Sequence, residues 1–109
     1  MAIDIRQRGS GQTRTLLVRA VVNCTGPNYD ITRIDTALIA RLREEGYLRQ
    51  DPLKLGFEVD AEYRVLDHAG QAAPDLFYVG PMLKARYWEA IAVPELRVHA
   101  KRLAELLAP

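Results

Sequence analysis

The sequence lacks the motifs by which most stand-alone enzymes and metal proteins are recognised. It has one cysteine, Cys24, so no internal disulfide can form and no second thiol completes a metal or redox pair. It contains no GxGxxG, no Walker-type glycine loop, no paired-cysteine zinc pattern and no nucleophile elbow around a serine. Dinucleotide-binding, phosphate-loop, zinc and serine-hydrolase signatures are therefore all missing from these 109 residues.

Titratable side chains are also not grouped in a way that indicates catalysis. The two histidines, His68 and His99, are isolated in sequence, and we expect each to be solvated or packed rather than a ligand or a general base. Cys24 is expected to be a small buried apolar side chain. The acidic residues are dispersed, so no carboxylate is predicted to be catalytic and no metal site is predicted.

Charge and hydropathy limit the kinds of partner and cellular location that we expect for this protein. Fifteen basic and fourteen acidic side chains leave a net charge of +1 without a basic cluster, which argues against nucleic acid. The longest apolar run, residues 16–22, contains Arg19 and is far shorter than the roughly 20 residues that a membrane helix needs. Residues 1–8 do not resemble a secretory signal. We therefore expect a cytoplasmic protein, with 49% hydrophobic and 27% charged residues, that forms one domain or part of one.

The first third of the chain predicts a hairpin followed by a strand that runs into a loop. Residues 3–6 alternate between apolar and polar, a Gly-Ser-Gly turn follows, and residues 13–22 form the second strand. That strand is polar at its start and apolar at its end, so its far end is expected to be covered on both faces. It stops at residues 23–28, where glycine and proline prevent regular pairing.

The remainder predicts two helices among short strands. A helix capped by Asp35 and stopped by Gly46 should bury the stripe of Ile34, Leu38 and Leu42. Residues 55–59 and 63–66 suggest a second hairpin with a loop after it, and residues 76–79 a strand that ends at glycine and proline, as residues 21–27 do. A last helix opens at Pro94. Its predicted apolar stripe is Leu96, Ala100, Leu103 and Leu107. The predicted class is α/β, with β-hairpins, a central helix and a C-terminal helix, and two neighbouring strands could present their Gly-Pro loops on one edge.

The segment from residue 80 to 94 is unusually apolar for a connection between a strand and a helix. Tyr87 and Trp88 either pack on the core of this domain or cover a flat apolar ligand or another chain.

Three pieces of sequence in order resemble the C-terminal part of FAD/NAD(P)-binding flavoproteins, most closely an uncharacterised family of predicted FAD/NAD(P)-binding oxidoreductases. The pieces are residues 21–27, the pair Gly80–Pro81, and residues 88–95. The resemblance spans nearly the whole chain and implies that residues 1–109 are the C-terminal portion of a Rossmann-like FAD/NAD(P)-binding domain.

The resemblance also implies roles for individual residues. Thr25 and Gly26 would lie near the dinucleotide, and Gly80 and Pro81 would approach the FAD phosphates and ribityl chain. Trp88, Ile91 and Ala92 would face the flavin ring at the start of the last helix, whose amides and dipole can stabilise charge on a reduced flavin. These seven positions are the predicted cofactor-binding residues, while catalytic residues remain unassigned.

Two departures from the family pattern shape the expected function. Pro81 stands where many members have aspartate, so a carboxylate bond to the ribityl chain is not available there. The glycine-rich βαβ unit that holds the ADP portion is missing from the chain, so we expect an FAD-binding segment that is inactive alone. A full-length parent would use FAD and could use NAD(P).

The expected partners are the missing N-terminal half or a second copy of the chain. The alternative is a small protein-interaction or subunit module that keeps the fold without binding flavin. A free-standing enzyme that uses Cys24 or a histidine is the weakest hypothesis, because nothing at recognisable spacing would activate either group.

Overall fold

A computed structural model describes residues 1–108, and it is a mixed α/β structure with two small antiparallel hairpins. This confirms the predicted class and the predicted presence of hairpins, a central helix and a C-terminal helix. In chain order the elements are β1 (Ala2–Arg6), β2 (Thr13–Leu17), the short 3-10 helix η1 (Ile31–Arg33), α1 (Ala37–Glu44), β3 (Arg64–Leu66), β4 (Ala72–Phe77) and α2 (Val93–Leu107).

The predicted N-terminal hairpin is present, but its second strand is shorter than expected. β1 pairs with β2 in a register that places Ile3 opposite Leu16, and Gly9 and Gly11 take the positive φ angles of the turn. The prediction that this strand continues to residue 22 with a buried end is wrong. Val21 and Val22 are 54% and 82% exposed, because β2 pairs only with β1 in the described part of the chain and no layer covers the continuation.

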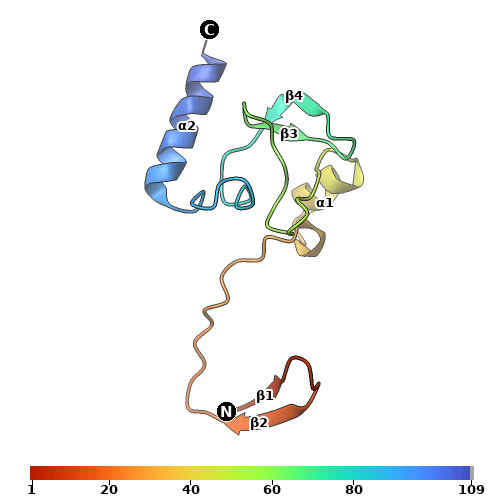
Figure 1. The fold of residues 1–109 in the computed structure, drawn as a ribbon, viewed down its shortest axis with the longest axis vertical. Coiled ribbons are helices and arrows are strands. Elements are labelled where there is room, and N and C mark those ends of the chain that lie inside the picture. The colour runs from red at the N-terminus through yellow and green to blue at the C-terminus, as the bar shows by residue number, and fades with distance from the viewer. Residues whose placement is uncertain (109) are drawn as a thin grey trace.

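The hairpin stands apart from the rest of the molecule (Figure 1). An extended segment, residues 18–28, leads from β2 to η1, and the molecule measures 61 × 32 × 25 Å. Its radius of gyration is 18.3 Å, whereas a compact domain of this size would have about 13 Å. The folded body therefore consists of residues 29–108, with β1 and β2 outside it.

The core of that body is formed by segments between the regular elements as much as by the elements themselves. Its fully buried members are Ile31, Leu48, Phe57, Val59, Tyr63, Val65, Leu83 and Ala90. Phe57 contacts Tyr78 edge to face, with ring centroids 4.8 Å apart. The core thus ties η1, β3 and the segment that follows β4 to one another.

Each helix buries only part of its predicted stripe, and Ile34, just before α1, packs against the core as predicted. In α1 the stripe was expected to include Leu38, but that side chain is 68% exposed, while Ile39 and Leu42 pack against the core. Thr36, not Asp35, stands at the N-cap, and it makes no side-chain cap bond. Gly46 ends the helix as predicted, with φ of 81°.

α2 begins with Pro94 in its first turn, as predicted. Of its predicted stripe, Leu103 packs against the core, whereas Leu107 is 56% exposed. The C-terminal end of α2 extends beyond the other segments (Figure 1), so Leu106 and Leu107 are left exposed.

The second hairpin joins different segments from those predicted. β3 pairs with β4, and the expected pairing of residues 55–59 with 63–66 is reduced to one isolated bridge between Val59 and Val65. β4 also begins at Ala72, in what was expected to be a loop. Pro74 is tolerated there because β4 is an edge strand. Neither helix in residues 1–108 is long and apolar enough to cross a membrane.

Candidate functional site

The structure places the predicted site residues in two separate regions. Thr25 and Gly26 lie on the exposed extended segment, where the Asn23 side-chain carbonyl accepts hydrogen bonds from the Thr25 amide at 3.0 Å and its hydroxyl at 2.8 Å. Gly26 has φ of 75° and open space around it. The expectation that two neighbouring strands present both Gly-Pro loops on one edge is wrong, since β2 and β4 belong to different sheets.

Gly80 and Pro81 follow β4 on the folded body. Gly80 is buried, and a Cβ atom there would lie 2.6 Å from the Tyr78 hydroxyl. The backbone of Gly80 thus lies close to the side chain of Tyr78, which leaves little room for a Cβ atom. Burial raises the pKa of the Tyr78 hydroxyl above its usual value. Pro81 is exposed beside it.

The segment that leads from Gly80 to α2 is wound into consecutive turns with an inner and an outer side. The Leu83 carbonyl accepts bonds from the amides of Arg86 and Tyr87, and Ala90 donates to the Tyr87 carbonyl. Leu83 and Ala90 are each 1% exposed, while Trp88 and Ile91 are 64% and 49% exposed. The buried pair therefore anchors the turns, and the outer side presents an aromatic and an aliphatic side chain.

Tyr87 and Trp88 differ in their surroundings, and packing on the core is confirmed for Tyr87 alone. Tyr87 packs on the core and lies 4.6 Å from the His99 ring, centroid to centroid. Trp88 points away from the core and is available for contact.

α2 begins directly after this surface, with Ala92 at its N-cap and no side-chain cap bond. Ala92 is partly buried and its carbonyl accepts the first helical bond, from Leu96. Within residues 1–108, the amides of Val93 and Glu95 have no hydrogen-bond acceptor. The positive end of a 15-residue helix thus lies next to Trp88 and Ile91 in the chain.

A cation that sequence reasoning missed is held at the same surface. The Lys84 ammonium lies 4.7 Å from the Trp88 ring centroid and 5.0 Å from that of Tyr29. Lys84 forms no ion pair within residues 1–108. Because Tyr29 and Trp88 are distant in sequence, only the apolar character of residues 80–94 pointed to this cluster.

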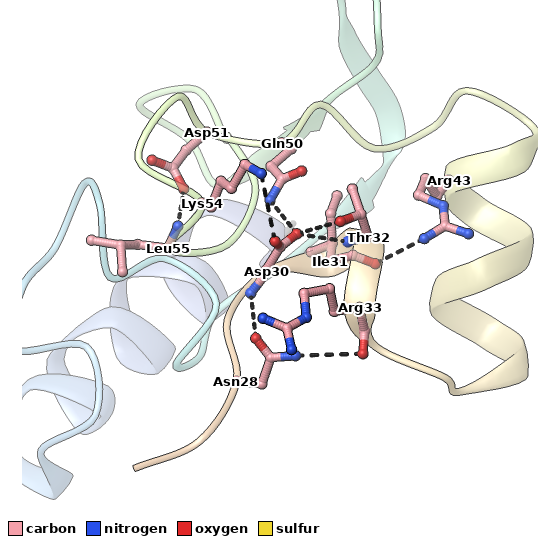
Figure 2. A network of polar contacts seen from close by, with 10 residues as sticks. All are labelled: Asn28, Asp30, Ile31, Thr32, Arg33, Arg43, Gln50, Asp51, Lys54 and Leu55. Carbon is pink, nitrogen blue, oxygen red and sulfur yellow. Dashed lines mark hydrogen bonds and ion pairs between the residues drawn. The ribbon is translucent and has the colours of Figure 1, made fainter. Parts of the chain in front are cut away.

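Tyr29 is positioned by the polar network that Figure 2 shows around Asp30. The Asp30 carboxylate accepts bonds from the Thr32 hydroxyl at 2.6 Å and the Gln50 amide at 2.8 Å. These bonds, the one from Thr32 first, lower the pKa of Asp30 from 3.8 to about 2. Lys54 lies 3.8 Å from the same carboxylate. The network joins the end of the extended segment to the loop after α1 and so fixes Tyr29 beside Lys84.

The remaining candidate side chains have structural surroundings. His99 shares a 2.8 Å hydrogen bond with the hydroxyl of buried Tyr63, and the His68 ring lies 3.2 Å from the Gly46 carbonyl. The expectation that Cys24 is buried is wrong, because the segment that carries it is exposed and extended. Within residues 1–108, no three His, Cys, Asp or Glu side chains gather as a metal site would require.

Comparison of the chain with protein-family models, with curated proteins and with solved structures finds no match. The candidate site is therefore defined by its geometry. It consists of the exposed side chains of Trp88 and Ile91, the Lys84 ammonium beside two aromatic rings, and the uncapped start of α2.

Proposed function

We propose that this chain is the C-terminal FAD-binding segment of a flavin-dependent oxidoreductase-like protein and is inactive alone. The observation that carries the proposal is the surface formed by Trp88, Ile91 and the uncapped start of α2. It coincides with the residues that the sequence resemblance assigns to the flavin ring.

The chemistry of this surface fits an isoalloxazine. The exposure of Trp88 and Ile91 to water is unfavourable. A flat apolar ring system would cover both side chains. The free amides of Val93 and Glu95 provide donors for a negatively charged edge of such a ring. When bound, the flavin would supply the electron transfer, and the residues of the chain would bind and orient it.

Alone, the segment lacks parts that a complete FAD site needs. The chain has no glycine-rich βαβ unit to hold the ADP portion, and Pro81 provides no carboxylate for the ribityl chain. The exposed Leu17, Val21 and Val22 have the character of a strand that belongs inside a larger parallel sheet. We propose that the missing N-terminal half, within a Rossmann-like domain, covers this strand and completes the dinucleotide site near Thr25 and Gly26.

The test is a titration of the purified chain with FAD while the fluorescence of Trp88 and of the flavin is followed together. Trp88 is the only tryptophan, so its quenching reports on this surface directly. We expect saturable micromolar quenching without turnover of NADH or NADPH. Trp88→Phe should weaken binding as measured by flavin fluorescence, and Tyr47→Phe, at a half-exposed tyrosine on another surface, is the matched control. An absence of quenching at every soluble concentration would rule out a flavin site on this segment.

The alternative function is a small interaction or subunit module that binds protein and no flavin. The exposure of Val21 and Val22, 54% and 82%, supports it, because an unpaired, extended apolar segment can pair with another chain. This alternative predicts a mass that rises with concentration in light-scattering measurements, together with no response to FAD. A monomer at all concentrations would exclude self-association as its mode of action.

A further inference from the structure

The folded body carries a groove with a volume of about 530 Å³. Neither Trp88 nor α2 is part of its lining. Its apolar lining includes Phe57 and Val59, which are 4% and 1% exposed, together with Leu66 of β3. Ala85 lies at its edge and is exposed. The volume falls within the range of about 300–1,000 Å³ that is usual for small-molecule sites.

Four charged side chains line this groove, and three of them are already neutralised or fully hydrogen-bonded. Arg49 pairs with Glu58 at 2.8 Å. The buried Asp51 carboxylate accepts bonds from the amides of Leu53, at 2.8 Å, and Leu55, so the turn that contains it satisfies its charge. Arg86 is the fourth, and it forms no ion pair within residues 1–108.

The guanidinium of Arg86 is held in one orientation. Its Nη1 donates to the Val59 carbonyl at 3.0 Å and its Nε donates to the Tyr87 hydroxyl at 3.2 Å. Its Cζ atom also lies 5.6 Å from the centroid of the Tyr87 ring. Nη2 has no partner in the described chain, so its hydrogens remain available. An arginine that is already oriented loses little freedom when it binds a carboxylate.

From this arrangement we propose that the groove binds a small flat organic carboxylate. The apolar body of the ligand contacts the groove lining at Leu53 and Leu66, over the buried Phe57, and the carboxylate accepts hydrogen bonds from Arg86. The apolar lining selects against small inorganic anions, and the unpaired cation selects against neutral ligands of the same shape. This site does not depend on the flavin proposal, since it uses neither Trp88 nor the start of α2.

The test uses 2-naphthoate as the probe and neutral 2-naphthamide as its matched control, each titrated into the ¹⁵N-labelled chain. We expect naphthoate to shift the amide resonances of Glu58, Val59 and Ala85, with a dissociation constant of about 1 mM, as expected for a ligand of this size. Naphthamide should bind about tenfold more weakly, because it forms no charge-assisted bond with Arg86.

Variants then test the charge of Arg86 and the shape of the groove separately. Arg86→Met should remove the preference for naphthoate over naphthamide, while Arg97→Met, at an exposed arginine on α2, should retain it. Ala85→Phe, which fills the groove without removing a hydrogen bond, should abolish binding of both probes.

Equal affinities of the two probes for the unmodified chain would overturn the proposal, as would shifts centred on other residues. Unchanged binding by Ala85→Phe would overturn it as well. If Arg86→Met loses its dispersed spectrum, the comparison of probes on the unmodified chain and the Ala85→Phe variant still decides the question.

Discussion

Gly56 is the glycine at which addition of a methyl group should lower the free energy of unfolding the most. Its backbone forms an isolated antiparallel bridge with Leu83, and the next amide, that of Phe57, donates to the Met82 carbonyl at 3.1 Å. A Cβ atom on Gly56 would lie 1.7 Å from the Met82 oxygen and 2.5 Å from its carbonyl carbon. The obstacle is backbone, so no side-chain rotation can relieve it.

The size of the effect follows from this geometry. To bring the new Cβ to 3.0 Å from the Met82 oxygen, the two segments must separate by at least about 1.3 Å, which breaks a buried hydrogen bond and opens the core at Phe57 and Leu83. Strain at φ of 129° and an unpaired buried amide each cost about 1–3 kcal/mol, so Gly56→Ala should lose about 3–5 kcal/mol. This is between about a third and all of the roughly 5–10 kcal/mol by which a body of this size is stable.

The measurement is urea unfolding followed by circular dichroism, with Gly70→Ala as the control. Gly70 also has a positive φ, 82°, but its added Cβ would meet only the guanidinium end of Arg49, which can move aside. The control should lose about 1–2 kcal/mol from backbone strain alone. If Gly56→Ala and Gly70→Ala are equally stable, the close approach of residue 56 to Met82 does not exist and the argument fails.

Three further predictions follow from other contacts. Tyr63→Phe removes the bond to His99 and should lower the free energy of unfolding by about 1 kcal/mol in urea titrations. Asp30 has a folded-state pKa of about 2 against 3.8 unfolded, so its contribution to stability is complete above pH 3.8 and is lost as the pH falls towards 2. Asp30→Asn should therefore remove that part of the acid-induced loss of stability, measured by unfolding at stepwise lower pH. Cys24, being exposed, should react fully with Ellman's reagent in the folded protein.

Each of these predictions has an outcome that contradicts it. Equal urea midpoints for Tyr63→Phe and the unmodified chain would mean that the hydroxyl contributes nothing through His99. An acid transition of the same size and position in Asp30→Asn would show that other carboxylates account for it. Protection of Cys24 until urea is added would mean that the extended segment is covered.

The sequence predicted well those turns and helix ends that depend on the residues at the position itself. The Gly-Ser-Gly turn, the stop at Gly46 and the start of α2 at Pro94 depend on the backbone preferences of the residues at those positions, and all three are present. The start of β4 escaped prediction because Ala72, Ala73 and Pro74 carry no β-branched or aromatic side chain, and their pairing is supplied by β3.

Features that depend on distant partners could not be predicted from local patterns. The apolar pattern at Val21 and Val22 predicts burial, but burial needs a neighbouring layer, and no described part of this chain provides one. The position of Lys84 between Tyr29 and Trp88 depends on the network around Asp30, which joins segments far apart in sequence. The cofactor-binding roles of Thr25, Gly26, Gly80, Pro81, Trp88, Ile91 and Ala92 stay predictions.

The separation of the β1–β2 hairpin from the body has a consequence for how the molecule unfolds. In residues 1–108, no hydrogen bond joins residues 1–22 to residues 29–108. An isolated two-stranded hairpin is only marginally stable in water, so its amide protons should exchange with solvent far faster than those of Val59 and Val65 in the core. The chain therefore behaves as two cooperative units of very unequal stability, and a substitution in the hairpin leaves the unfolding of the body unchanged.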